Sequence, residues 1–301
     1  MPTVNQPVYI RSAACISPQQ SEPDYRALLD PKVLRRMSRI MRMGAAAALA
    51  CLREAGVTIP DAIVTGTAYG CLEDTGLFLR SMIERNEELL QPATFIQSTH
   101  NTVGAQIALL LQCTGYNNTF VHRGFSFESA LLDAILLMAD KEAETVLVGG
   151  IDELTEASYA LLSRFGLFRH AKAGEGAAFF LLTGEPSGND YARLDGIETF
   201  YKPDGTGEIE KRLMSSLSSR GLVPGDIDLV ITGDYDEIST TLFPGKPNLT
   251  FKQLSGEYPT SASFGLWTAA HQVRSGAGRV LLYSHYLGIY HSIYLVSDVA
   301  E

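Results

Sequence analysis

A serine and a histidine four residues apart are the first residues of this sequence that could do chemistry. His122 and Ser126 stand in the segment VHRGFS, a polar turn ahead of an apolar stretch. With Asp234 or Glu257 nearby, the pair would form a hydrolase-like arrangement, in which a carboxylate orients the imidazole and the imidazole activates the hydroxyl. A serine at a helix start more commonly serves as the N-cap, and no GxSxG elbow surrounds Ser126. The sequence leaves both roles open and favours the structural one.

The elements that must position this turn are found in residues 119–153, TFVHRGFSFESALLDAILLMADKEAETVLVGGIDE. The pattern predicts a tight polar turn followed by an apolar helix from about residue 126 to 139. A buried strand over residues 145–148 follows and ends in the pair Gly149-Gly150. The order is therefore turn, helix, strand and double glycine.

An internal repeat extends this pattern over the chain. The segment LREAGVTIPDAIVTG at 52–66 is echoed by LSSRGLVPGDIDLVITG at 217–233, and matching glycines lie 165 and 167 residues apart. A second echo pairs ETVLVGG at 144–150 with GRVLLYSH at 278–285. Two copies of one β/α unit predict a layered α/β protein whose two halves share central helices.

The turn, helix, strand and double glycine, together with GEGAAFFLL at 174–182, resemble a β-ketoacyl synthase, a condensing enzyme of the thiolase superfamily. The resemblance is strongest at 31–70, 95–182 and 217–297. It implies a thiolase-like five-layer α-β-α-β-α sandwich from two pseudo-duplicated halves. We expect these halves to be residues 1–155 and 156–301, fused into one structural unit, in a chain markedly shorter than a standard elongating synthase.

The same resemblance indicates where the family's catalytic residues should stand. The nucleophilic cysteine belongs at a helix start, where free N–H groups and the helix dipole stabilise a thiolate and an oxyanion. Family spacing, counted back 26 residues from Gly150, places Gly124 there. The two histidine positions correspond to Asp234 in LVITGDYDE and to Glu257 in FKQLSGEYP, where Lys252 is retained.

These replacements predict a protein that does not condense acyl groups. A glycine cannot be acylated, and carboxylates at 234 and 257 would repel the developing enolate. The candidate pocket is expected to contain the side chains around the turn and the segment that matches the family's gating loop: His122, Ser126, Lys252, Leu287 and Gly288. No cofactor is implied.

Within the family, subunits without the nucleophile act as chain-length factors beside an active ketosynthase. The resemblance therefore implies a chain-length-factor-like partner in fatty-acid, polyketide or aryl-polyene-type biosynthesis, in a heterodimer or a homodimer that works with acyl carrier protein. The alternatives are a noncanonical acyltransferase or hydrolase that uses Ser126, and an acyl-binding or carrier-protein-binding module.

Two further segments have open interpretations. Lys32, Arg35, Arg36, Arg39 and Arg42 lie mostly on one face of a helix predicted from Pro31 to Gly56. They form either a solvated face or a contact surface for an acidic carrier protein or a partner subunit. By resemblance, Asn101 and Gln106 fall in a segment that lines the dimer interface and the acyl tunnel, although capping or buried polar contacts would account for them equally well.

Composition limits the remaining possibilities. The chain has 46% hydrophobic and 19% charged residues and a net charge of −10, which argues against nucleic acid as a partner. It contains no run of eighteen apolar residues and no signal-peptide pattern at its start, so we expect a cytoplasmic protein without a membrane partner. The four cysteines form no CxxC and read as free thiols, and no histidine has metal-ligand spacing.

Overall fold

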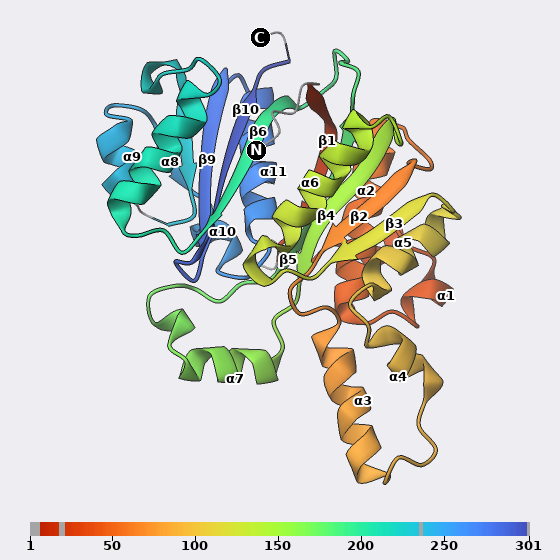
Figure 1. Ribbon diagram of the computed structural model, residues 1–301. Coiled ribbons are helices and arrows are strands. Elements are labelled where there is room, and N and C mark those ends of the chain that lie inside the picture. Colours follow the sequence, from red (N-terminus) through yellow and green to blue (C-terminus); the bar gives the residue numbers. More distant parts are fainter. Residues whose placement is uncertain (1–6, 18–21, 235–236, 300–301) are drawn as a thin grey trace.

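The computed structural model describes residues 7–17, 22–234 and 237–299, and within them the strands form one ten-stranded sheet (Figure 1). The strands of its first half are β1 (Val8–Ile16), β2 (Ala62–Gly66), β3 (Tyr116–Phe120), β4 (Thr145–Asp152) and β5 (Gly176–Thr183). Those of its second half are β6 (Ala192–Tyr201), β7 (Leu229–Thr232), β8 (Asn248–Thr250), β9 (Arg279–Tyr286) and β10 (Tyr290–Ser297).

The two halves of the sheet have the same topology. Outward from the centre, the strand order is β1-β5-β4-β2-β3 on one side and β6-β10-β9-β7-β8 on the other. In each half the first two pairings are antiparallel and the last two are parallel. The predicted echoes occupy equivalent places, because they contain β2 and β7 in one case and β4 and β9 in the other. The predicted duplication is confirmed.

Five layers result from the way helices cover this sheet. The helices are α1 (Pro31–Leu34), α2 (Arg39–Ala55), α3 (Leu72–Glu84), α4 (Pro92–Gln97), α5 (Thr102–Leu111), α6 (Ser126–Ala139), α7 (Glu156–Arg164), α8 (Thr206–Ser218), α9 (Glu237–Leu242), α10 (Lys252–Ser255) and α11 (Ala262–Arg274). Helices α6 and α11 form the middle layer, α2 packs on the outer face of the first half-sheet, and α8 packs on that of the second. The thiolase-like sandwich predicted from the sequence is therefore present.

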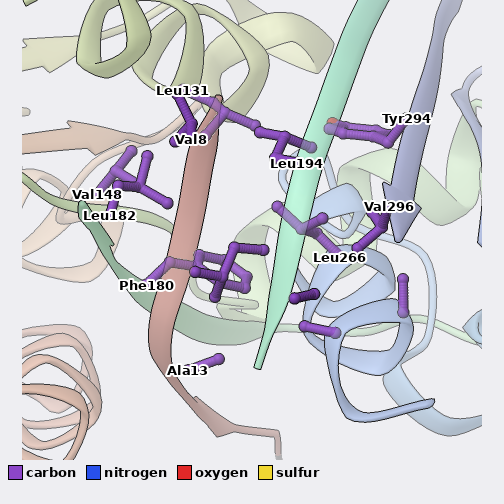
Figure 2. Packing of buried hydrophobic residues seen from close by; sticks show 14 of the residues in the cluster. Val8, Ala13, Leu131, Val148, Phe180, Leu182, Leu194, Leu266, Tyr294 and Val296 are labelled. Atoms are coloured by element: carbon purple, nitrogen blue, oxygen red, sulfur yellow. The ribbon is translucent and has the colours of Figure 1, made fainter. Parts of the chain in front are cut away.

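The central core joins the two halves. Phe180 of β5, Leu131 of α6 and Leu266 of α11 are fully buried in one cluster that also contains Tyr294 of β10 (Figure 2). Three residue pairs between β1 and β6 connect the two half-sheets edge to edge. Large side chains from both halves are buried in this single cluster, so neither half could expose this surface without a large free-energy cost.

Local signals set most element boundaries. Gly56 ends α2 with a φ of 69°, and its N–H bonds to Leu52 and Arg53 carbonyls, as predicted. The helix expected to run without interruption from Pro31 is split into α1 and α2, with a break at residues 35–38. By strand pairing, β5 lies between β4 and β1 in the first half, downstream of the division after residue 155 that the sequence suggested. In the described part of the chain, no helix has the length and apolar character needed to cross a bilayer.

Candidate functional site

Gly124 lies buried in a short 3₁₀ turn, Arg123–Phe125, directly before α6. A Cβ atom built on it would lie 2.7 Å from Cγ of Tyr290 and 2.9 Å from Cδ1 of Tyr286. Such separations are shorter than non-bonded carbon atoms tolerate. Both tyrosine rings would therefore have to move before any side chain could occupy this position. The place where the nucleophile was expected is therefore both unreactive and filled.

Four aromatic side chains lie around Gly124. We call these residues, Tyr69, Phe125, Tyr286 and Tyr290, the aromatic plug. The rings of Phe125 and Tyr290 meet edge to face with centroids 5.1 Å apart, and those of Tyr286 and Tyr290 are 6.3 Å apart. The hydroxyl groups of Tyr69 and Tyr286 are 3.2 Å apart. Desolvation raises the pKa of Tyr286 far above its ordinary value, and that of Tyr69 is also raised. The plug is thus a packed, neutral group of side chains.

The two expected histidine positions meet at a buried lysine. Nζ of Lys252 lies 2.6 Å from Oε2 of Glu257 and 3.5 Å from Oδ2 of Asp234, and it donates to the carbonyl of His285. The side chains of Lys252 and Glu257 are 2% and 5% exposed, whereas that of Asp234 is 44% exposed. Burial raises the pKa of Glu257, and the Lys252 charge opposes that shift. The repulsive carboxylate inferred at 257 is therefore held in an ion pair, which weakens its repulsion of an anion.

The hydrolase-like pair does not assemble. The Ser126 hydroxyl is fully buried, donates to the carbonyl of Arg123 at 2.8 Å and accepts from the backbone N–H of His122 at 2.9 Å. The exposed His122 ring bonds instead to Ser129 through Nδ1 at 2.8 Å. Ser126 is thus engaged in local backbone contacts that hold the turn, and its hydroxyl does not contact the imidazole.

The segment expected to gate the pocket is a tight turn between β9 and β10. Leu287 and Gly288 both have positive φ, 57° and 63°, as in the type I′ turns of hairpins. Leu287 is 48% exposed, so it does not take the place of a buried gating residue. Tyr286 and Tyr290, the residues that flank this turn, reach the site. The sequence signal for them was the segment YLGIY at 286–290. Tyr286 and Tyr290 are paired across the two strands of the hairpin, so their side chains lie on the same face.

Among the described residues, one small cavity lies beside the plug. A cavity of about 10 Å³ is lined by Tyr69, Glu257, Tyr286 and side chains of the α7 segment. That volume is close to the minimum for a single water molecule and far below the size of an acyl chain. His100 and Asn101 are exposed before α5, so the predicted tunnel contacts of this segment stay a prediction.

Asp152, at the end of β4, positions Tyr69 and was missed by sequence reasoning. The fully buried carboxylate accepts from the N–H groups of Ala68 and Tyr69 and from the hydroxyls of Thr67 and Thr260. Burial raises its pKa to about 6 against the effect of these donors. It connects the loop that carries Tyr69 to the start of α11. The sequence signal for Asp152 was an acidic residue two positions after the double glycine that ends the predicted strand.

The fold is that of a condensing enzyme, and Gly124, the predicted position of the nucleophile, is enclosed by Tyr286 and Tyr290. The sequence profile of the beta-ketoacyl synthase N-terminal domain matches residues 10–178, more than half of the chain. The chain therefore belongs to the β-ketoacyl synthase family. No curated protein matches the sequence.

Solved structures agree on the fold. The ishigamide ketosynthase/chain length factor is 17% identical with a TM-score of 0.82, over 98% of this chain and 100% of that chain. AntDE:AntF, a type II PKS acyl-carrier protein in complex with its ketosynthase bound to the hexaketide, is 14% identical with a TM-score of 0.80, over 98% and 99%. A beta-ketoacyl synthase from Burkholderia phymatum STM815 is 14% identical with a TM-score of 0.77, over 98% and 100%. At these identities the likeness concerns the fold.

Proposed function

We propose that this protein is a non-catalytic ketosynthase homologue that acts as a chain-length-factor-like partner of an active ketosynthase in carrier-protein-dependent biosynthesis. The observation that carries the proposal is the closed site: Gly124 offers no nucleophile, and Tyr286 and Tyr290 occupy the space a thioester would need. The Lys252–Glu257 ion pair takes the place of imidazole donors to an enolate oxygen. The similar ketosynthase/chain length factor structures support a partner role.

The two edges of the sheet suggest where a partner subunit binds. At one edge, β8 has three residues and follows the segment PGKP at 244–247, and prolines and lysines beside a short strand protect an edge from pairing. At the other edge, β3 has five residues and contains neither residue type. Leu109 on α5 and Leu136 on α6, the helices that flank β3, are 73% and 49% exposed. We assign the partner interface to this open edge.

A basic patch offers a contact for an acidic carrier protein. Arg26, Lys32, Arg35 and Arg36 are exposed around α1, and a groove of roughly 610 Å³ beside them is also lined by Arg42. These cations are concentrated in a protein whose net charge is −10, so they face an acidic partner with a locally favourable field. We propose that the carrier protein of the pathway binds here.

The activity is tested with the purified protein, acyl-carrier protein and malonyl-carrier protein. We expect neither acyl transfer to the chain, by intact mass, nor carbon dioxide release above background. Gly124→Cys should also remain unacylated, because the plug still fills the site, while Gly124→Cys with Tyr290→Ala provides the opened comparison. Acylation of the natural chain, or decarboxylation dependent on it, would overturn the proposal.

The partner is tested by co-purification with the cysteine-bearing ketosynthase of the same host. We expect a stoichiometric complex that is lost in Leu109→Asp with Leu136→Asp and kept in the matched control Leu254→Asp, another exposed leucine remote from β3. Retention of the complex in the double variant would place the interface elsewhere. An acyl-binding or carrier-binding module without a ketosynthase partner would bind carrier protein and show no such complex.

The carrier contact is tested by charge reversal. Arg35→Glu with Arg36→Glu should weaken carrier binding at least ten-fold at low salt, and Arg80→Glu on α3 is the control. Equal weakening by both variants would show a general charge effect and would remove the assignment to α1.

A further inference from the structure

Glu128 is a buried carboxyl group that bridges the two halves of the protein. It lies in the first turn of α6 and is 2% exposed. Its Oε1 accepts from the hydroxyl of Ser292 at 2.9 Å and from that of Tyr294 at 3.0 Å, both on β10. Its Oε2 is buried without a hydrogen-bond partner among the described residues. A carboxyl group in this position, with one oxygen unsatisfied, requires an explanation.

The same strand face carries part of the aromatic plug. Side chains of alternate residues lie on one face of a strand, so Tyr290, Ser292 and Tyr294 all point from β10 toward the middle layer. Glu128 stands four residues after Gly124, where α6 begins. The contacts of Glu128 therefore fix β10 against α6 two and four residues beyond the tyrosine that closes the site.

No cation faces this carboxyl group among the described residues. Tyr294 is the titratable group in contact with it. Of the groups on the other elements packed against α6 and β10, Arg123 in the turn before α6 is exposed, and burial lowers the pKa of His285 on β9 to about 3, so that ring stays neutral. The following groups have partners of their own. Arg193 on β6 pairs with Asp195, and His271 and Arg274 on α11 bond to the Trp267 carbonyl and to Glu54. The others are Asp152 on β4, bonded to Thr67 and Thr260; Tyr116 on β3, bonded to Asp133; Glu198 on β6, paired with Arg212; and Tyr283 on β9, bonded to His291.

We propose that Glu128 is a proton-controlled clamp, a positioning residue that holds β10, and with it Tyr290, against the start of α6. At Oε1 the two hydroxyl donors satisfy the carbonyl oxygen of a neutral carboxyl group, whereas a carboxylate also needs donors to Oε2, which has none among the described residues. Loss of the proton would leave a buried anion with a bare oxygen, and the contact between α6 and β10 would weaken.

The direction of the pH effect follows from burial. Desolvation raises the pKa of Glu128 to about 7 from 4.5, although its own backbone N–H and the two hydroxyl donors oppose the shift. The folded protein therefore keeps the proton up to near-neutral pH, while the unfolded chain loses it at lower pH. The clamp is fully effective below about pH 4.5, weakens as pH rises toward 7 and changes little above that, so the plug opens more often at neutral and alkaline pH than in acid.

The experiment is hydrogen exchange of the β10 segment, residues 286–297, at pH 6 and pH 8, expressed as protection factors corrected for intrinsic exchange. If opening exposes the carboxyl group to water, the pKa change predicts that protection falls about ten-fold between these pH values. In Glu128→Gln the fall should disappear, because glutamine does not ionise and keeps a similar shape. Glu142→Gln, an exposed residue after α6, should behave as the natural chain.

Equal pH dependence in the natural chain and in Glu128→Gln would overturn the clamp. Ser292→Ala gives an independent test should the glutamine variant fail to fold. Loss of a donor that favours the charged form should move the midpoint of the protection change to higher pH. An unchanged midpoint would also contradict the proposal.

Discussion

The two halves of the molecule share one sheet topology and differ in what connects their strands. Between β2 and β3 the chain makes a long excursion with α3, α4 and α5, while the described part of the equivalent connection between β7 and β8 contains the single short helix α9. Between β4 and β5 it inserts α7, whereas β9 and β10 are joined by a tight turn at Leu287 and Gly288. Figure 1 shows α3, α4 and α7 projecting from the same end of the sheet.

This comparison distinguishes the strands that both halves share from the helical insertions of the first half. The equivalent central strands, β4 and β5 in one half and β9 and β10 in the other, are almost entirely buried, while the excursions of the first half expose large apolar side chains. On α3, α4, α7 and the segments beside them these are Leu77, Leu79, Ile83, Leu89, Phe95, Ile96, Tyr159, Leu161 and Phe165. Monomeric proteins rarely expose so many large apolar groups together, so the first half is the side from which we expect binding.

The largest change in the free energy of unfolding is expected in the second half of the molecule, where Lys252 and Glu257 form a buried ion pair. Lys252→Met leaves Glu257 buried without its cation, and we expect a loss of about 3–5 kcal/mol in the free energy of unfolding. Lys252→Met with Glu257→Leu should recover most of that loss, since no charge then remains unpaired. Urea unfolding of both variants measures the difference. A double variant as unstable as the single one would show that packing, and not charge, is responsible.

The equivalent test in the first half is made at Gly124. Gly124→Ala places a methyl group against Tyr290 and Tyr286, and we expect a cost of about 1–3 kcal/mol. Gly76→Ala on the exposed α3 helix is the control, because nothing lies within 4 Å of its added Cβ. That control should be neutral or slightly stabilising. Equal effects at the two glycines would mean that the plug is loosely packed.

A third test uses pH, because carboxyl groups at the junction of the halves are buried. Burial raises the pKa of Glu128 and Glu153 to about 7 and that of Asp152 to about 6. The folded state therefore binds more protons than the unfolded state between pH 5 and 7. The free energy of unfolding should fall as pH rises through this window and level off above it. Thermal unfolding at several pH values checks this, and a melting temperature that rises from pH 5 to 8 would contradict it.

The smallest effects are expected on the excursions. Leu79→Ser and Ile83→Ser on α3 should change the free energy of unfolding by less than about 0.5 kcal/mol, because these side chains are 47% and 77% exposed. Leu213→Ala and Leu217→Ala on α8, a helix of the same length, should cost about 2–5 kcal/mol each, because both leucines are 1% exposed. A large loss from the α3 variants would place that helix in the folding core.

Sequence reasoning reached the layered fold, since periodicity and repeats depend on local spacing. The helix at 126–139 and the strand at 145–148 were predicted within a few residues. Family spacing assigned the catalytic positions to Gly124, Asp234 and Glu257, and this assignment stays a prediction. Sequence reasoning missed Tyr69, Tyr286, Tyr290 and the two buried carboxyl groups, because a tyrosine or a glutamate carries no local sign of what will lie opposite it.

The sequence by itself determined that a condensing-enzyme scaffold is present and that residue 124 has no reactive side chain. Only the tertiary structure decided that the vacated position is occupied. Residues of β10 meet the start of α6 after more than 160 positions of intervening chain, and contacts at that separation are set by the packing of whole layers. The fold also buried Lys252 together with Glu257, five residues along the chain, and so turned a predicted repulsive charge into an ion pair.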